Sequence, residues 1–441
     1  MSGLGSSLSH SSSESQIMSL GTVTLPPLVN GRAWTIWLTM GMTSLMSSEL
    51  SPLDMTTGGG SSFSSTSSIL TPLPPVGSLY MDLLVMTALN FISILHTKTE
   101  LAYRDINVCR GHWLSKRLRG LDPYEVMVKA QLAALLEVSA HPKPGNIHRF
   151  RDRWGKRFEH FIAGAVALGP PVREAFTRGL KAWSRGQLSL IGLGRLVRIA
   201  VEHQLKAHSG GNTHLGVIML FIPIAASAPA WINSPSPSII ERALVEVLRA
   251  TTPKDSVELL KAVRKLKPSG LGKPPKGLPD ASKSCRTDLS MYELLKASSK
   301  WDGVARELVE GLPVTLSVGL PSLLKTYEET GDVNTAVVQC FLEILSRAPD
   351  TLIARNVGLA LKPNSTIDEA VQAGMAEASW VSEKAREALA LGGMLTSKGR
   401  RFIEKLDLEL ESRGPSYNPG TTADITASSI FVALLMGRRL I

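Results

Sequence analysis

An uncharged segment at residues 215–232 constrains the fold of this chain more than any other feature. The small polar sequence SGGNTH, at 209–214, comes directly before it. A segment of this length and hydropathy either crosses a membrane or lies as a helix inside a protein core. Pro223 and Pro229 interrupt it, and no basic cluster follows Trp231. We therefore interpret it as a central helix buried among other helices, and we expect no membrane association.

The pattern from residue 122 onward is helical. The sequence DPYEVMVKAQLAALLEVSA, at 122–140, places its apolar side chains on one broad stripe. Ser238 with Glu241, and Thr366 with Glu369, form capping-box patterns before two further apolar periodic segments. Sustained alternation of apolar and polar residues, which would indicate strands, does not occur. These observations predict an all-α protein in which a single multi-helix domain at 122–441 encloses the buried central helix.

Residues 1–121 differ from the rest of the chain. Ser, Thr and Gly dominate much of this part, and of 48 Lys and Arg residues only Arg32 precedes Lys98. Low-complexity sequence of this kind buries too little apolar surface to offset its chain entropy. Three interpretations stay open: a disordered tail, a start codon placed upstream of the true start (with Met127 one candidate for that start), and a membrane-anchored leader. We assign no chemistry to this segment.

Charge and cysteine content narrow the functional class. The net charge of +10 favours anionic partners such as nucleic acid or phosphorylated small molecules. The three cysteines are widely spaced, which indicates a reducing compartment, and we expect a cytoplasmic protein. The sequence contains no Walker A pattern and no HExxH motif, so a kinase or a zinc hydrolase is not supported. The Pro-, Gly- and Lys-rich stretch 265–284 predicts a mobile loop between two helical halves.

Polar residues cluster at four points where apolar helices begin or end. The turn HPKPGNIHRFRD, at 141–152, offers cationic side chains and backbone N–H groups to a phosphate. GGNTH, at 210–214, opens the uncharged segment, and APDTLIARNVG, at 348–358, places Asp350 as a helix N-cap. NPGTTAD, at 418–424, puts one carboxylate at the start of an apolar helix. Each also has a plain structural explanation, as a basic surface loop, a helix cap or a solvated helix end.

Taken together, these segments resemble motifs of the triphosphoribosyl-dephospho-coenzyme A synthase family, in the order in which that family has them. The family's lysine-proline-glycine turn is similar to 143–145, and its TGGxNTHKG motif to 210–216. Its GxRGEAxxGFP, DTNLLxRGG and SPGGSAD stretches are similar to 303–313, 350–358 and 418–424. The resemblance covers about 127–441.

Three departures from the family pattern concern the acceptor substrate more than the fold. Leu215 stands where the family has lysine after NTH. The family's GAHxDM segment is matched only loosely by HRFRDRW, with Asp152 as the equivalent carboxylate, and NPGTTAD replaces SPGGSAD.

The resemblance implies an enzyme that transfers the 5-triphosphoribosyl group of ATP to 3′-dephospho-CoA and releases adenine, making a prosthetic-group precursor. It implies Mg²⁺ as the cofactor that accompanies ATP. The implied catalytic residues are His214, Glu307, Asp350 and Asp424, of which Asp350 and Asp424 are also the implied metal ligands. The implied nucleotide- and phosphate-binding residues are Lys143, Gly145, Asn146, Arg149, Asn212, Thr213, Arg355 and Gly420.

Two alternatives stay open. One is the same ribosyl transfer to a different acceptor, which the sequence cannot separate from the first reading. The other is a basic all-α nucleic-acid-binding module. Because the positive charge is spread along 98–441 and no helix-turn-helix or zinc-finger signature occurs, we expect no nucleic-acid partner.

Overall fold

The computed structural model describes residues 122–268 and 271–441. The predicted low-complexity segment at 1–121 lies outside the described residues. Within the described ranges the regular structure is helical, and β-contacts are isolated bridges such as His148 with Arg151. The predicted all-α class is confirmed. None of the described helices is both long and apolar enough to cross a bilayer. The helices are α2 (Pro123–Ser139), α3 (Phe158–Ala167), α4 (Gly169–Arg185), α5 (Leu193–Ala207), α6 (Leu215–Ser227), α7 (Pro237–Arg249), α8 (Pro253–Leu266), α9 (Met291–Ser298), α10 (Gly303–Val309), α11 (Leu320–Thr330), α12 (Val333–Arg347), α13 (Thr351–Leu361), α14 (Ile367–Ala390), α15 (Ser397–Ser412) and α16 (Gly420–Leu435).

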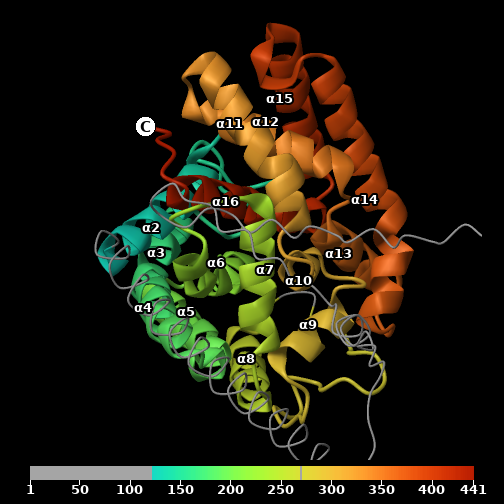
Figure 1. Ribbon diagram of the computed structural model, residues 1–441. Coiled ribbons are helices and arrows are strands. Elements are labelled where there is room, and N and C mark those ends of the chain that lie inside the picture. Colours follow the sequence, from blue (N-terminus) through green and yellow to red (C-terminus); the bar gives the residue numbers. More distant parts are fainter. Residues whose placement is uncertain (1–121, 269–270) are drawn as a thin grey trace, which may run out of the picture. The chain divides into compact units, whose positions relative to one another are not determined.

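Two apolar helices, α6 and α16, form the centre of the described fold (Figure 1). Nearly all residues of both helices are buried after the first turn. Between the two helices, the ring centroids of Phe221 and Phe431 are 4.4 Å apart. Helices α4, α5 and α7 contact α6, while α2 and α12 contact α16. The predicted buried central helix is therefore confirmed. Pro223 does not end it, since α6 continues to Ser227 and passes into the 3₁₀ turn Ala228–Ala230.

Side-chain caps fix where several helices begin. Asp122 accepts a hydrogen bond from the backbone N–H of Tyr124 at the start of α2. The predicted capping box of Thr366 and Glu369 is present at the start of α14. The predicted cap at Ser238 is wrong, because Ser236 caps α7 and Pro237 occupies its first position. Proline suits that position because its ring fixes φ and its missing N–H would have no helical partner there.

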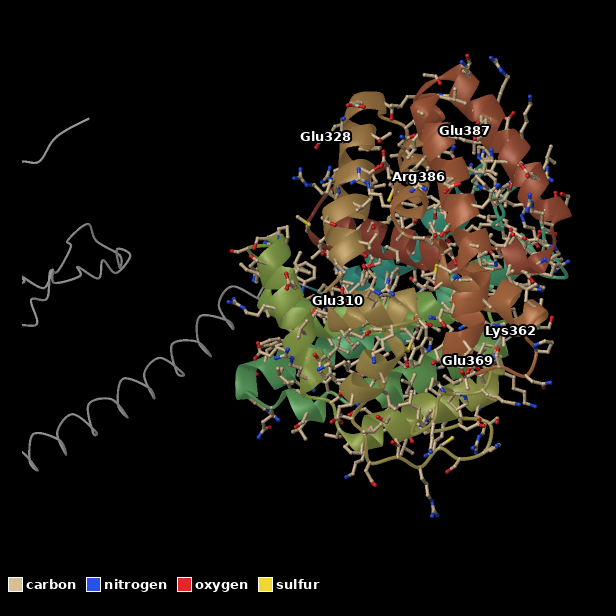
Figure 2. The ribbon with its side chains drawn as sticks, turned by 90° about the vertical axis from the view of Figure 1, so that its right-hand side faces the viewer. Glu310, Glu328, Lys362, Glu369, Arg386 and Glu387 are labelled. Atoms are coloured by element: carbon tan, nitrogen blue, oxygen red, sulfur yellow. The ribbon has the colours of Figure 1, made fainter. Side chains whose placement is uncertain are left out.

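The outer faces of the peripheral helices are charged. Figure 2 shows exposed side chains directed away from the core on α14 and at the ends or faces of α10, α11 and α13. The labelled examples are Glu310, Glu328, Lys362, Glu369, Arg386 and Glu387. This distribution is the ordinary one for helices that bury a single apolar face.

Helices α13 and α14 approach each other closely through two glycines. A Cβ atom added to Gly358 would lie 1.7 Å from the carbonyl oxygen of Ala370, and one added to Gly374 would lie 2.0 Å from that of Ala354. Neither distance is possible between real atoms, so the two backbones can pack in this way only because both positions lack a side chain. This contact holds α13, which carries Arg355, against the long helix α14.

We expect Gly374→Ala to destabilise the protein, although the same change in an isolated helix would stabilise it by about 1 kcal/mol. The overlap with the Ala354 carbonyl forces α13 and α14 apart and should cost about 2–3 kcal/mol. Denaturant unfolding of the variant measures the cost. Gln372→Ala, an exposed change on the same helix, is the matched control and should be near neutral. A Gly374→Ala variant as stable as the control would contradict the close contact.

The loop between α8 and α9 contains the stretch predicted to be mobile. Its Lys273 carbonyl accepts a hydrogen bond of 2.8 Å from the N–H of Ile367, which places this part of the loop beside the start of α14. The loop also forms one wall of a cavity, with Gly272 and Leu278 among its lining residues. Its predicted position between two helical halves is confirmed, and its mobility stays a prediction.

Candidate active site

A cavity of about 320 Å³ lies at the starts of α6, α13 and α16. Its volume falls within the usual range for small-molecule sites. We call the part lined by the starts of α6, α13 and α16 the polar end, and the part lined by α8, α9 and the loop that joins them the apolar end. The polar side chains that line the cavity are Asn212, Asp280, Ser298, Asp302, Thr351, Arg355, Thr421 and Asp424, of which Asp280 and Ser298 belong to the apolar end. The apolar side chains include Met219, Leu259, Val263, Leu278, Leu294 and Trp301.

Three helix N-termini converge on the polar end. Leu215 and Gly216 of α6, Thr351 and Leu352 of α13, and Thr421 of α16 all line the cavity within the first turn of their helices. Backbone N–H groups of the first turn lack helical partners and carry the positive end of the helix dipole. Such an arrangement favours an anion, above all a phosphate.

Asp424 is one of the carboxylates at the polar end, and we call its position the floor of the cavity. It lies in the second turn of α16 and faces the start of α6, where the N–H of Val217 points toward it. A Cβ atom at Gly216 would be 1.9 Å from Asp424 Oδ2, so the carboxylate occupies space that only glycine leaves. Burial, together with the nearby charges of Glu137, Asp350 and Asp302, raises the pKa of Asp424 well above its ordinary value.

Arg355 is the cation of the polar end. Its Nε is buried and has no hydrogen-bond partner among the described residues, and none of the ion pairs found there includes it. Burial lowers the pKa of Arg355, while Asp302, Asp350 and Asp424 act in the opposite direction. A buried N–H donor without a partner is costly, which points to an anionic ligand in the cavity.

Three charged residues at or beside this cavity were missed from the sequence: Asp280, which lines it from the loop before α9, together with Asp302 and Lys156. Asp302 lines the cavity, and its Oδ1 caps α10 by accepting a hydrogen bond of 2.9 Å from the N–H of Ala305. Lys156 donates a hydrogen bond from Nζ to the carbonyl of Asn212 and is close enough to Asp424 for that charge to raise its pKa, against the larger lowering by burial. The available signals were the aspartate before GVARELV and the lysine just after RDRWG.

The position of Lys156 bears on one departure from the family pattern. Leu215, which replaces the expected lysine after NTH, lines the cavity with an apolar side chain. Lys156 comes from a different segment but places its ammonium group at the same helix start, against Asn212. The chain therefore has a lysine cation beside GGNTH even though the motif itself lacks one.

Asp350 is fully engaged in holding two helices. Its Oδ1 caps α13 by accepting hydrogen bonds from the N–H groups of Leu352 (2.8 Å) and Ile353 (3.1 Å). Its Oδ2 accepts from both the N–H and the hydroxyl of Thr422, at 2.7 and 2.8 Å, at the start of α16. Its N-cap role is confirmed. Because four donors occupy the buried carboxylate, which does not line the cavity, the geometry favours a structural role over the predicted catalytic and metal-binding ones.

Glu307 has a similar structural position. It is buried in α10, and its two oxygens accept hydrogen bonds from the N–H groups of Val314 (2.8 Å) and Thr315 (2.9 Å). These donors belong to the turn that leads into the π-helical segment Thr315–Gly319. Burial raises the pKa of Glu307. Since Glu307 does not line the cavity, its contacts support the backbone, and the predicted catalytic role gains no support from its position.

His214 lies behind the wall of the cavity. Its ring is buried against Phe161, and its Nδ1 is 2.8 Å from the hydroxyl of Thr213, which also contacts His208 Nε2 at 3.1 Å. Burial lowers the pKa of His214 to about 3, with smaller effects from His208 and Lys156. The imidazole is therefore neutral at physiological pH. The predicted role as an acid for the leaving adenine is poorly matched by a neutral ring that does not line the cavity.

The depressed pKa of His214 predicts a pH dependence of stability. The pKa of His214 is about 6.5 in the unfolded chain and about 3 in the folded chain. The free energy of unfolding therefore decreases as the pH falls below 6.5. Between pH 7.5 and pH 5, His214→Gln should therefore lose about 1–2 kcal/mol less stability than the wild type. Denaturant titrations at both pH values measure this difference, with His203→Gln as the matched control. Equal losses in wild type and His214→Gln would contradict a buried neutral ring.

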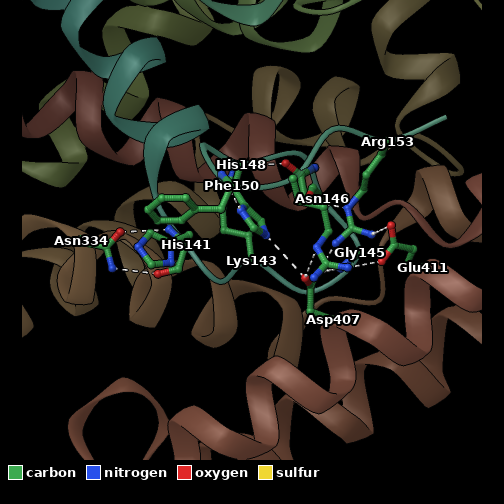
Figure 3. Close-up of polar contacts among 11 residues, drawn as sticks. His141, Lys143, Gly145, Asn146, His148, Phe150, Arg153, Asn334, Asp407 and Glu411 are labelled. Carbon is green, nitrogen blue, oxygen red and sulfur yellow. Dashed lines mark hydrogen bonds and ion pairs between the residues drawn. The ribbon is translucent and has the colours of Figure 1, made fainter. Parts of the chain in front are cut away.

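The lysine-proline-glycine turn lies away from the cavity and is anchored to α15 (Figure 3). The N–H of Gly145 donates to Asp407 Oδ1 at 2.9 Å, and Arg153 forms a buried ion pair with the same carboxylate. Gly145 has a φ of +73°, and a Cβ there would lie 2.8 Å from the carbonyl of Tyr417, so a side chain is excluded. Lys143 is fully buried and paired with Glu137.

The remaining predicted phosphate ligands divide between the turn and the cavity. Asn146 is buried and donates to Asn418 Oδ1 at 2.9 Å, while Arg149 is exposed and bonds to the carbonyl of Ser139. Asp152 is exposed and accepts from the N–H of Phe158 at the start of α3. Gly420 begins α16, where a Cβ would lie 2.5 Å from Leu352 Cδ2, so it permits α13 and α16 to meet.

The structure thus brings together only part of the predicted set. Asn212, Arg355 and Asp424 line one cavity, and the backbone of Gly420 lies beside it. The Oδ1 of Asn212 also accepts a hydrogen bond of 3.1 Å from the N–H of Leu215, the first residue of α6. Lys143, Gly145, Asn146, Arg149, Thr213, His214, Glu307 and Asp350 do not line it.

Comparisons with known proteins place this chain in one enzyme family. Residues 123–440 match the family described as ATP:dephospho-CoA triphosphoribosyl transferase. A Klebsiella pneumoniae protein named 2-(5″-triphosphoribosyl)-3′-dephosphocoenzyme-A synthase is 25% identical over 322 residues, which cover 72% of this chain and 93% of the relative. A Pseudomonas fluorescens protein assigned the same activity is 26% identical, with 68% and 87% covered. The crystal structure of a protein assigned as triphosphoribosyl-dephospho-CoA synthase from Archaeoglobus fulgidus superposes with a TM-score of 0.43 and 28% identity, covering 64% of this chain and all of that one.

Proposed function

Because this chain belongs to the ATP:dephospho-CoA triphosphoribosyl transferase family, and is therefore a transferase, we propose that it joins ATP to 3′-dephospho-CoA. The 2′-hydroxyl oxygen of the acceptor attacks C1′ of the ATP ribose, and the bond from C1′ to N9 of adenine breaks. The hydroxyl proton is removed, and the departing adenine takes up a proton. The observation that carries the proposal is the cavity in which three helix N-termini and Arg355 surround the carboxylates of Asp302 and Asp424.

The polar end of the cavity suits the triphosphate. Arg355 supplies a guanidinium group with a buried, unused donor, and Lys156 supplies an ammonium group beside Asn212. The first-turn N–H groups of α6, α13 and α16 add positive potential without adding a titratable charge. Arginine is especially suited to phosphate because its planar fork can donate two parallel hydrogen bonds.

Asp424 is the residue that we assign to the reacting centre. Glycosyl transfer develops positive charge at C1′, which a nearby carboxylate stabilises. The same carboxylate can remove the proton of the attacking 2′-hydroxyl. Its raised pKa moves it toward the range in which a group takes up and returns protons at neutral pH. Thr421, one turn earlier on α16, is placed to orient the ribose.

The residues at the polar end fit a magnesium-bound nucleotide. No group of three or more His, Cys, Asp or Glu side chains forms a complete metal site in the part of the chain that the structure describes. Magnesium in nucleotide sites usually binds one or two carboxylates and takes its other ligands from phosphates and water. Asp302 and Asp424 both line the cavity, so we assign them this role in place of Asp350, the metal ligand implied by the family resemblance. When bound, Mg²⁺ would neutralise charge on the triphosphate.

The apolar end suits an aromatic base. Trp301 and the leucines of α8 and α9 contribute apolar side chains next to Asp302, and Asp280 is the one charged residue among the described loop residues that line this end. Stacking and apolar burial would hold adenine before the reaction and exclude water from the breaking bond. Water must be excluded because it could otherwise replace the acceptor hydroxyl as the nucleophile.

Adenine release tests this proposal. The full chain is incubated with ATP and Mg²⁺, with and without 3′-dephospho-CoA, and free adenine is followed by chromatography. We expect adenine only when the acceptor is present, together with an adduct whose mass equals ATP plus acceptor minus adenine. Nucleotide binding without adenine release would keep the cavity as an ATP site but reject this acceptor.

Arg355→Met is expected to raise the KM for ATP by about 30- to 100-fold, because a charge-assisted contact to the triphosphate is lost. Initial rates of adenine release at varied ATP concentration measure the change, and direct nucleotide titration should give the same ratio. Arg347→Met, which removes a largely exposed arginine far from this cavity, is the matched control. An unchanged KM and an unchanged ATP affinity would remove Arg355 from the triphosphate site.

A further inference from the structure

Lys143 is a lysine that the proposed chemistry does not use. Its side chain is fully buried, with an exposed fraction of 0%, and it does not line the cavity. Its Nζ forms an ion pair with Glu137 and donates a hydrogen bond of 3.1 Å to Asn146 Oδ1. A phosphate would have to displace these partners and open the core to reach the amine. Lys143 is therefore poorly placed as a ligand for the triphosphate.

The Lys143–Glu137 pair is nevertheless connected to the floor of the cavity. Glu137 lies on α2, which packs against α16, and among charged neighbours it has the largest effect on the pKa of Asp424. The other charged groups near Asp424 are Asp302, Asp350, Lys156 and Arg355. Of these neighbours, only Glu137 is held in a buried ion pair.

A chain of hydrogen bonds makes a second connection. Asn146, which accepts from Lys143, donates from Nδ2 to Asn418 Oδ1 at 2.9 Å. The backbone carbonyl of Asn418 accepts from the N–H of Gly420 at 2.9 Å, at the first residue of α16. Asn146 is itself held by Arg153, whose Nε donates to its carbonyl at 2.9 Å (Figure 3). The contacts of Lys143 thus extend to the helix start that carries Thr421 and Asp424.

We propose that Lys143 is a positioning residue for the transfer reaction: it neutralises Glu137 behind the cavity floor and, through Asn146 and Asn418, fixes the first turns of α16. This inference rests on the proposed function, because it concerns the rate of that reaction. Removing the amine alone leaves a buried carboxylate without its counter-charge behind Asp424. Removing both charges restores neutrality. A phosphate ligand would behave differently, since no change at Glu137 could replace its contact.

The test compares Lys143→Met, Glu137→Gln and the double variant with the wild type. We expect Lys143→Met to lower kcat for adenine release by about 10- to 100-fold, the usual cost of losing a supporting contact behind a reactive group. The dissociation constant for ATP, measured by calorimetry, should change by less than about threefold, because the triphosphate contacts stay in place. The double variant should recover most of the lost kcat. Lys129→Met, on the neighbouring helix α2, is the matched control.

A second variant keeps the test decisive if Lys143→Met does not fold. Asn418→Ala breaks only the hydrogen-bond connection, at a partly exposed residue, and should lower kcat by about tenfold at unchanged ATP affinity. An ATP affinity at least tenfold weaker in Lys143→Met, without recovery in the double variant, would identify Lys143 as a phosphate ligand. Unchanged kcat in Asn418→Ala would overturn the connection to α16.

Wild-type protein that releases no adenine overturns the proposed function and this inference together. Normal adenine release by the wild type, without recovery of kcat in the double variant, overturns the inference alone.

Discussion

Asp424→Asn is expected to lower kcat for adenine release by about 10³-fold, the range found when a proton-transfer group or a charge-stabilising group is removed from an active site. The amide is nearly the same size as the carboxylate, so the contact with Gly216 and the packing of α16 should be kept. It can neither take the hydroxyl proton nor stabilise positive charge at C1′. Chromatographic assay of adenine under saturating substrates measures the effect, and thermal unfolding checks the fold.

Two companion variants interpret the result. Gly216→Ala keeps the aspartate at 424 but introduces a Cβ that would lie 1.9 Å from its Oδ2, so the carboxylate must move. We expect a similar loss of kcat. Asp288→Asn, an exposed change in the loop before α9, should have wild-type kcat. If Asp424→Asn turned over as fast as Asp288→Asn, the reaction would not depend on this carboxylate.

Asp350→Ala is expected to lower the free energy of unfolding by about 3–4 kcal/mol, since it removes the caps of two helices and four hydrogen bonds at once. The donors of Leu352, Ile353 and Thr422 would then lie buried without partners. Urea unfolding followed by circular dichroism measures the loss. Asp332→Ala, which removes the cap of α12 at a more exposed position, is a suitable comparison and should cost about 1 kcal/mol.

The same variant separates the structural role of Asp350 from a chemical one. If Asp350 only holds α13 and α16 together, the Asp350→Ala variant should regain part of its activity under conditions that stabilise the folded state, such as low temperature. An Asp350→Ala protein with wild-type stability and no activity would contradict the capping role and return Asp350 to the catalytic set.

Local sequence patterns predicted the helices well because helix caps and apolar periodicity are short-range properties. The capping box of Thr366 and Glu369 and the N-cap at Asp350 are confirmed. The error at Ser238 also has a local cause, since Pro237 moved the start of α7 by fixing its first position. The burial of α6 was predictable because a long uncharged segment lies either in a membrane or in a protein core, and Pro223 and Pro229 argued against a membrane span.

The partners of charged residues were not predictable from the same patterns. Lys143 looked like a phosphate ligand by residue type, yet Glu137 neutralises it across a turn. Asp350 looked reactive, yet Thr422, which is distant in sequence, occupies one of its oxygens. Lys156 and Asp302 were overlooked because neither stands inside a recognised motif. Which charges stay unpaired depends on tertiary packing. Of the charged residues predicted for the site, only Arg355 and Asp424 line the cavity.

The contact between Gly216 and Asp424 has a consequence for protein synthesis. Helix α6 supplies the glycine and one cluster of N–H groups, but the carboxylate arrives only with α16, after the apolar wall has been made. A growing chain that ends between α6 and α16 contains Gly216 but not yet Asp424, whose carboxylate occupies the space beside that glycine. A partly made chain therefore lacks the Asp424 carboxylate of the proposed site until α16 has been added.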